Sequence, residues 1–287
     1  MIKHHEDTKM FREAVNLTAA ETAFAARLIE KDYFCTVLLE QLAAVRGGQL
    51  VFKGGTCLAK VHADFYRLSE DLDFVIPMSV NASRSERSKQ ATGLKEAVAA
   101  LPRVLPCFRV VEPLQGASES TQYNGSVGYV SVLGQQADII KIEISLREPL
   151  LTPTVTGAAR TILLDPVSGA PLVPVLSVRC ISKTEAMAEK FRAALTRREA
   201  AIRDFYDLDY VARKHEVRTE DAELISLVRQ KLSVPGNDPV NIGPGRLAEL
   251  RGQLEARLKP VLRERDFAEF DLERAYKRVV KMAEAVS

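Results

Sequence analysis

The chain has 287 residues, 46% of them hydrophobic, so it is long and apolar enough to bury a sizeable core, which we expect to form two closely packed lobes. Its formal net charge of only +2 excludes a bulk electrostatic signature of nucleic-acid binding, and any RNA contact must be a local patch. The polar N-terminus and the absence of an apolar run near the roughly 20 residues of a membrane helix predict a cytoplasmic protein with no membrane partner.

The first 45 residues are predicted to be helical. Thr18 and Glu21 have the spacing of a capping box before a helix over 22–29, and Gly47 and Gly48 are expected to end the next helix. The four cysteines are far apart in apolar surroundings, which predicts buried thiols rather than a zinc site or a disulfide framework. They are Cys35, Cys57, Cys107 and Cys180.

A glycine pair separates a predicted strand at 50–52 from a predicted helix at 56–63. Glycine at such a junction allows a tight turn and a close approach of phosphate to main-chain N–H groups, and the first helical turn adds unpaired donors. The stretch that we expect to cradle phosphates is Lys53, Gly54, Gly55 and Thr56.

Two aspartates lie on the next predicted strand, over 71–76. Asp71 and Asp73 are two residues apart, so in a strand they share one face, opposite Leu72 and Phe74. Two carboxylates beside a phosphate cradle are what Mg²⁺-dependent phosphoryl or nucleotidyl transfer needs. The alternative is a solvated edge strand, which the apolar residues of this segment disfavour. A phosphatase with an Asp-x-Asp motif is also disfavoured, because its nucleophile ends a strand, whereas this strand runs on through 74–76.

The segment before these aspartates supplies two further candidates. Arg67 lies four residues before Asp71, in a segment expected to enter the active cleft, and we assign it to phosphate binding. Ser69 would share the face of both aspartates if the extended conformation begins early. Its hydroxyl could contact the γ-phosphate, and its phosphorylation by a partner kinase would repel the triphosphate. The alternative is a turn serine that caps its own backbone.

The middle of the chain changes from helix to strand. A polar helix is predicted over about 82–101, with Ser83 and Glu86 spaced as a cap. Strands are then predicted at 108–111, 129–133 and 139–145, with a turn at Asn124-Gly125. Prolines between 150 and 180 predict a crossing segment with one or two short strands.

The remainder is predicted to be almost wholly helical. Ser182 and Glu185 again form a capping-box pattern, and Lys190 lies beside the apolar stripe of the helix that follows. A solvated lysine stem is the usual alternative for such a residue. Further on, Asp204 and Asp207 lie three residues apart on one helix face, where acids of a first turn often only complement the helix dipole.

The motif string "FKGGTCLAKVHADFYRLSEDLDFVIP" resembles the AbiEii/AbiGii toxin family, and the Gly-Gly-Thr, helix, Asp-x-Asp order resembles the wider DNA polymerase β-type nucleotidyltransferase superfamily. The resemblance extends over most of the chain. "IEKDYFCTVLLEQLA" is similar to the helix before the family's first strand and "KIEIS" to its second motif. "EAMAEKFRAAL" and "RDFYDLDYV" are similar to its third and fourth.

The resemblance implies roles for four further residues. Glu143, in the second motif, would be the third metal carboxylate; its alternative is the solvent face of an ordinary amphipathic strand. Lys190 would bind the triphosphate. Asp204 and Asp207 would hold Lys190, a ribose hydroxyl or the attacking group, and the sequence does not choose among these.

The resemblance implies an α/β (α+β) fold with a polymerase-β-like nucleotidyltransferase core around a mixed sheet. Residues 1–180 would form this lobe, and residues 181–287 a helical lobe that closes the cleft over the triphosphate. The expected enzyme is a Mg²⁺-dependent nucleotidyltransferase toxin of a toxin–antitoxin pair. MenT-like relatives modify tRNA, so the resemblance implies transfer from an NTP to the tRNA 3′ end, which would block translation, and a cognate antitoxin. A small-molecule or protein acceptor, or a non-catalytic nucleotide-binding module, are the alternatives.

Overall fold

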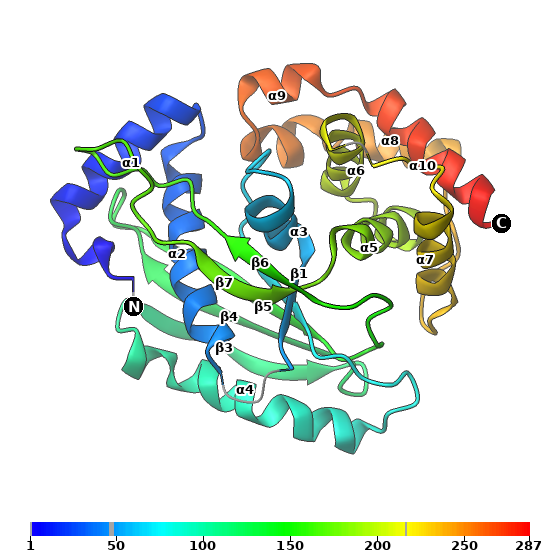
Figure 1. Ribbon diagram of the computed structural model, residues 1–287, viewed down its shortest axis with the longest axis horizontal. Helices are drawn as coiled ribbons and strands as arrows, with labels where there is room; N and C mark the ends of the chain where they lie inside the picture. The colour runs from blue at the N-terminus through cyan, green and yellow to red at the C-terminus, as the bar shows by residue number, and fades with distance from the viewer. Residues whose placement is uncertain (1, 46–48, 216) are drawn as a thin grey trace. The chain divides into compact units, whose positions relative to one another are not determined.

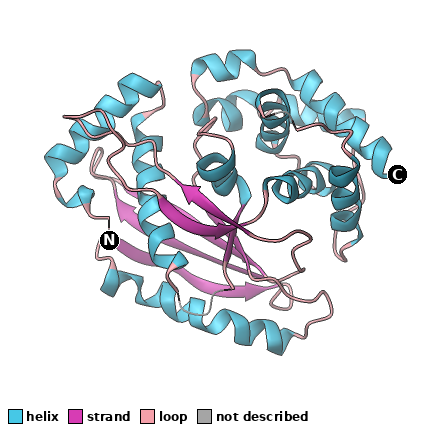
Figure 2. Ribbon diagram, viewed as in Figure 1, coloured by secondary structure: helices cyan, strands magenta, loops and turns pink. Residues whose placement is uncertain are grey.

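The computed structural model describes residues 2–45, 49–215 and 217–287, and these form two compact units. The first unit comprises Met1–Leu150 and Thr154–Ile181, and the second comprises Leu151–Pro153 and Ser182–Ser287. Figure 2 shows the strands in the first unit and helices in the second. The predicted helix stop at Gly47-Gly48 includes residues outside the described ranges.

The elements of the first unit are η1 (His4–Glu6), α1 (Thr8–Thr22), α2 (Ala26–Ala43), β1 (Val51–Lys53), α3 (Gly54–Cys57), η2 (Leu58–His62), β2 (Leu72–Val75), α4 (Arg84–Val104), β3 (Phe108–Ala117), β4 (Gln122–Val130), β5 (Ala137–Ser145), β6 (Val155–Ala159) and β7 (Leu176–Cys180). Those of the second unit are α5 (Lys183–Thr196), α6 (Ile202–Lys214), α7 (Ala222–Ser233), α8 (Pro244–Arg251), η3 (Leu254–Leu258), η4 (Lys259–Val261), α9 (Glu264–Glu269) and α10 (Leu272–Val286).

Among the described residues, seven strands form one sheet in the order β3-β4-β5-β2-β1-β7-β6. The β1–β7 and β2–β5 pairs are parallel, and the other neighbouring pairs are antiparallel. This confirms the predicted mixed, partly antiparallel sheet. Strand β1, which leads into the glycine pair, and strand β2, which carries Asp73, lie in the interior of the sheet, where each is paired on both sides.

Helix α2 crosses one face of this sheet (Figure 1) and is buried along most of its length. Its Phe34 ring stacks on Tyr129 of β4, with ring centroids 4.0 Å apart and an interplanar angle of 26°. Phe11 of α1 packs on Tyr33 of α2 at 4.7 Å, which brings the N-terminal helix onto the same cluster. Aromatic burial of this kind is the dominant favourable contribution to such a core.

Helix α2 also carries a buried carboxylate, Asp32, that forms an ion pair with a lysine of η2, the helical turn that follows α3. Lys60 of η2 is fully buried, and its Nζ lies 2.6 Å from Asp32 Oδ1 and 2.8 Å from Thr36 Oγ1. Lys60 Nζ also donates to the Arg160 carbonyl at 3.2 Å, and Asp32 Oδ2 accepts from Thr161 Oγ1 at 2.7 Å. Three separate segments of the chain therefore meet at this one ion pair.

The second unit is built on a helical core in which α5 contacts α6, α7 and α10. Its Phe191 and Leu195 are fully buried. Glu185 pairs with Lys231 of α7 at 2.7 Å and accepts backbone N–H bonds from residues 151 and 152. These bonds explain why Leu151–Pro153 belongs to this unit. None of the described helices is long and apolar enough to cross a bilayer.

The predicted caps have three different outcomes. Ser83 and Glu86 form a complete capping box at α4, as predicted. The prediction that Thr18 caps a helix is wrong, because Thr18 lies inside α1 and its hydroxyl donates to the Ala14 carbonyl. At α5, Ser182 accepts from the Glu185 N–H, but the Glu185 carboxylate binds other partners, so only half of the predicted box forms.

The predicted turn at Asn124-Gly125 is wrong, since both residues lie within β4. The chain turns instead at Ser118, Glu119 and Ser120, all with positive φ. Strand β3 shifts register between Glu112 and Gln115, and a side chain at Gly125 would come within 3.1 Å of the β3 backbone. The glycine therefore accommodates an irregular strand rather than a turn.

We predict that Lys60→Met lowers the free energy of unfolding by about 3–5 kcal/mol, because it leaves the Asp32 carboxylate buried without its cation. Urea titration of the full chain measures this. The double variant Lys60→Met/Asp32→Leu should recover part of the loss, since both charges are then removed. The control is Arg27→Ala, whose ion pairs with Glu70 and Asp138 involve a side chain that is 59% exposed, for which at most about 1 kcal/mol is expected. Equal effects of the Lys60 and Arg27 variants would contradict the prediction.

Candidate active site

The glycine pair lies at the junction of β1 and α3, as the sequence predicts. Lys53 is extended, whereas Gly54 has a φ of +76°, a conformation that side chains disfavour. A Cβ at Gly54 would lie 2.0 Å from Asp73 Oδ2. Glycine is therefore required here for two reasons, the backbone angle and the close approach of the Asp73 carboxylate.

Two of the predicted phosphate ligands converge on the second glycine. A Cβ at Gly55 would lie 2.6 Å from Arg67 Nη2 and 3.3 Å from Ser69 Oγ. The Arg67 side chain is buried, and its guanidinium carbon lies 5.7 Å from the centre of the Tyr66 ring. The structure thus places a guanidinium and a hydroxyl against the first turn of α3.

Thr56 has a structural contact that the sequence does not reveal. Its hydroxyl is buried and donates to the carbonyl of Asp71. This bond ties the start of α3 to the segment that enters β2. Any contact of Thr56 with a phosphate would therefore use its backbone N–H, which lies in the first turn of the helix.

The two aspartates alternate with buried residues, as predicted. Asp71 directly precedes β2 and Asp73 lies within it; both are half-buried, whereas Leu72 and Phe74 are buried. Because β2 pairs with β1 on one side and β5 on the other, the edge-strand alternative is wrong. Lys53 of β1 is the register partner of Asp73, so a cation neighbours this carboxylate on the strand face.

Glu143 lies on β5 directly beside Asp73 in the parallel register, so their side chains leave the same face of the sheet. It is exposed and alternates with the buried Ile142 and Ile144. Its Oε2 lies 3.5 Å from Gln122 Nε2. Carboxylate oxygens are the donors that Mg²⁺ prefers, so Asp71, Asp73 and Glu143 fit the ion chemically.

The second unit brings together the other three predicted residues. Lys190 Nζ of α5 lies 2.7 Å from Asp204 Oδ1 and 2.8 Å from Asp207 Oδ2, both on α6. Both carboxylates are buried, and the Lys190 side chain is only 14% exposed. The solvated-stem alternative for Lys190 is therefore wrong. Of the three roles left open for the aspartates, the structure shows that of holding Lys190.

A further cation completes this charge cluster. Arg197 Nη1 lies 3.4 Å from Asp204 Oδ2. Asp204 also lies in the first turn of α6, so it complements the helix dipole as well as Lys190. The cluster thus has two carboxylates and two cations, and its ion pairs hold the Lys190 ammonium group in place.

Sequence reasoning missed the buried acid Asp209, two residues beyond Asp207. It binds Arg274 Nη2 at 2.7 Å and Arg213 Nε at 3.0 Å and lies 3.8 Å from Arg278. Only the i,i+4 spacing of Asp209 and Arg213 is visible in the sequence, because the other two arginines lie on α10. The cluster joins α6 to α10 and leaves Asp209 fully paired.

The family model of the nucleotidyl transferase AbiEii toxin, type IV toxin–antitoxin system, matches residues 37–283. A search of curated proteins finds no match. Among solved structures, JHP933 from Helicobacter pylori is similar with a TM-score of 0.53 and 17% identity, over 92% of this chain and 93% of that chain.

A second similar structure is a putative nucleotidyltransferase from H. pylori, with a TM-score of 0.53 and 17% identity, over 92% of this chain and 96% of that chain. At this identity the two structures establish the fold alone, and the family rests on the sequence match. The match covers the glycine turn, both aspartates, Glu143 and Lys190. The chain belongs to the AbiEii nucleotidyl transferase toxin family of type IV toxin–antitoxin systems.

Proposed function

We propose that the protein transfers a nucleoside monophosphate from a nucleoside triphosphate to the 3′ acceptor end of tRNA and thereby blocks translation. Family membership supports the transferase class and implies a triphosphate substrate and an antitoxin partner. The observation that carries the proposal is the approach of the Asp73 carboxylate to Gly54, since it sets a metal-binding acid beside the turn that would hold phosphates.

In this proposal the first turn of α3 binds phosphate oxygens through its backbone N–H groups, and nearby side chains add positive charge and a hydroxyl. Arg67 suits this role because its guanidinium lies against Gly55. The nucleotide-binding residues are Lys53, Gly54, Gly55, Thr56, Arg67, Ser69 and Lys190. Asp71, Asp73 and Glu143 would hold Mg²⁺, which supplies neutralisation of the phosphate charge when it is bound.

The reaction would be an in-line displacement at the α-phosphorus. The oxygen of the acceptor hydroxyl forms a bond to phosphorus, the bond to the oxygen bridging the α- and β-phosphates breaks, and pyrophosphate leaves with that electron pair. The hydroxyl proton passes to solvent. Lys190, held by Asp204 and Asp207, offers an oriented ammonium for the negative charge that builds on pyrophosphate.

We assign the catalytic carboxylates and the phosphate cradle to a nucleotidyltransferase lobe, residues 1–180, and the lysine cluster to a C-terminal helical lobe, residues 181–287. Each lobe contributes charge of a different kind. The first supplies metal ligands and backbone donors, and the second supplies a preorganised cation.

The experiment that tests the function incubates the protein and Mg²⁺ with each α-labelled nucleoside triphosphate and total RNA. We expect label in tRNA, and its loss after treatment that removes the terminal nucleotide. Label in protein or in a small molecule would instead identify another acceptor. No label in any fraction, with triphosphate still bound, would indicate a non-catalytic nucleotide-binding module.

We predict that Asp71→Asn and Asp73→Asn each lower transfer at least ~10²-fold, the scale for losing a transition-state charge stabiliser. Asparagine keeps the size of the side chain beside Gly54, so the fold should persist. Glu112→Gln on β3 is the control, an exposed strand acid outside this cluster that should leave transfer unchanged. Substantial transfer by either aspartate variant at saturating Mg²⁺ would remove these residues from the metal site.

Lys190→Ala should lower transfer at least ~10²-fold. It should also destabilise the fold by about 3–5 kcal/mol, because Asp204 and Asp207 would remain buried without their cation. Lys190→Arg should restore stability better than transfer, since the guanidinium fork differs in reach from an ammonium.

A triple variant separates these two effects. Lys190→Ala/Asp204→Asn/Asp207→Asn removes the buried charges together, so we expect it to regain much of the free energy of unfolding while transfer stays low. Transfer that returns along with stability would show that the cluster is only structural.

Ser69→Glu should weaken triphosphate binding, because the negative charge would lie beside Asp71 and Asp73 and against Gly55, as a phosphate would. Ser69→Gln controls for bulk and Ser69→Ala for loss of the hydroxyl. Equilibrium binding of a non-hydrolysable triphosphate measures all three. If the Glu variant binds as tightly as the Gln variant, Ser69 is not a charge-operated switch.

A further inference from the structure

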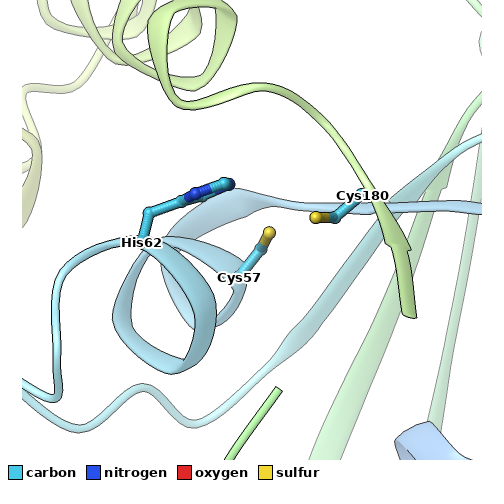
Figure 3. Close-up of side chains that lie close together, drawn as sticks. All are labelled: Cys57, His62 and Cys180. Atoms are coloured by element: carbon cyan, nitrogen blue, oxygen red, sulfur yellow. The ribbon is translucent and has the colours of Figure 1, made fainter. Parts of the chain in front are cut away.

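Three metal-ligating side chains that no part of the proposed reaction uses lie together in the first unit. Cys57 ends α3, His62 ends η2 and Cys180 ends β7, and their ligand atoms all lie within 4.8 Å of one another. Figure 3 shows the side chains converging on one point. Cys57 and Cys180 are buried and His62 is half-buried, so the cluster is enclosed but can be reached past the imidazole.

The local helix geometry brings Cys57 and His62 to the same place. In an α-helix, residues five apart are about 140° apart around the axis, because 3.6 residues make one turn. Residues 58–62 form a π-helical turn instead, in which hydrogen bonds join residues five apart. The wider turn carries His62 round to the side of Cys57.

The sheet supplies the third ligand. Cys180 of β7 is the parallel register partner of Phe52 in β1, so its sulfur is held beside the strand that leads into α3. Space for that sulfur depends on Gly157 of β6. A Cβ at Gly157 would lie 2.7 Å from Cys180 Sγ and 2.5 Å from Val61 Cγ1, so any side chain there would press on the cluster.

The ligand chemistry suits a metal. Two thiol sulfurs and one imidazole are the donors that a soft or borderline ion prefers, and the thiols release their protons when such an ion binds. His62 Nε2 lies 2.9 Å from the Ile181 carbonyl oxygen, which can only accept. The ring proton is thus fixed on Nε2 and the lone pair on Nδ1, the arrangement typical of a metal-binding histidine.

We propose that Cys57, His62 and Cys180 bind a thiophilic transition metal ion of the Zn²⁺ class, with water as the fourth ligand. Zinc–sulfur bonds are about 2.3 Å and zinc–nitrogen bonds about 2.0–2.1 Å, so tetrahedral ligands lie about 3.5–3.8 Å apart. Closing from at most 4.8 Å shortens each separation between ligand atoms by no more than about 1.3 Å. Cys57 and Cys180 are free, buried thiols, as the sequence predicts, and the proposal departs from that prediction only in making them metal ligands.

The ion would brace the phosphate cradle, because Cys57 directly follows Thr56 in α3 and the metal would tie that helix to β7. This bracing role rests on the proposed function, whereas the metal binding does not. A site made of two sulfurs and one imidazole is distinct in chemistry from the oxygen ligands Asp71, Asp73 and Glu143. The two sites would therefore select different metals.

The test is titration of the reduced, metal-free full chain with Co²⁺. We expect one equivalent to give the ligand-field and thiolate-to-cobalt charge-transfer bands of a tetrahedral site, and Zn²⁺ to displace it. Cys57→Ser and Cys180→Ser should each weaken binding at least ~10-fold, and Cys107→Ser, which alters a half-buried thiol outside the cluster, should not. His62→Gln provides a third variant at a half-buried position if a serine variant fails to fold.

Absence of these bands, or equal bands in the His62→Gln and Cys180→Ser variants, would overturn the proposal. A wild-type protein that yields a Cys57–Cys180 disulfide and stays unable to bind Co²⁺ after reduction would overturn it as well. Because the readout is metal absorption, failure here and absence of nucleotidyl transfer are separate results. Zn²⁺ should also raise the unfolding temperature of the wild type but not of the Cys180→Ser variant.

Discussion

The buried ion pair between Lys60 and Asp32 is the constraint on which the first unit depends. It joins the helical turn after the glycine pair to the central helix α2, and Thr161 adds the segment that leads toward β7. A charge pair of this kind is costly to break and adds little over a hydrophobic contact, so its value lies in fixing position. The glycine pair and Thr56 of the phosphate cradle, and Cys57 and His62 of the metal-ligating cluster, lie on the short helical segment that this ion pair anchors.

The second unit uses the same principle three times. Glu185 pairs with Lys231, Asp209 with Arg213 and Arg274, and Lys190 with Asp204 and Asp207. Each cluster contains a fully buried carboxylate, Glu185, Asp209 or Asp207. Lys231, like Lys190, is shared by two carboxylates, but Lys231 is fully buried, whereas the Lys190 side chain is 14% exposed. Lys190 is therefore the one of these two lysines that solvent reaches, and its carboxylate partners hold the ammonium group in place.

Residue patterns within a few positions of one another predicted many of the strands and helices. The two-residue spacing of Asp71 and Asp73 predicted their alternation with the buried Leu72 and Phe74, and the glycine pair predicted the strand-to-helix turn. Contacts between distant segments were not predictable: Asp32 with Lys60, Asp209 with Arg274, and Cys57 with Cys180 have no local signal. Predictions from the sequence were also wrong or incomplete where the backbone departs from a regular helix or strand. The π-helical turn aligns Cys57 with His62, and the shifted register of β3 places Gly125 in a strand. The family resemblance supplied Glu143 and Lys190, which periodicity alone leaves ambiguous.

The central claim is that the cradle and its carboxylates direct attack to the α-phosphorus of a triphosphate. The most direct measurement compares the same triphosphate labelled at the α- and at the γ-phosphate, in reactions with total RNA. Nucleotidyl transfer requires α-label in the acceptor and γ-label in released pyrophosphate, in equal amounts. Transfer of γ-label to the acceptor, with the α-label left in nucleoside diphosphate, would show phosphoryl transfer instead and contradict the account.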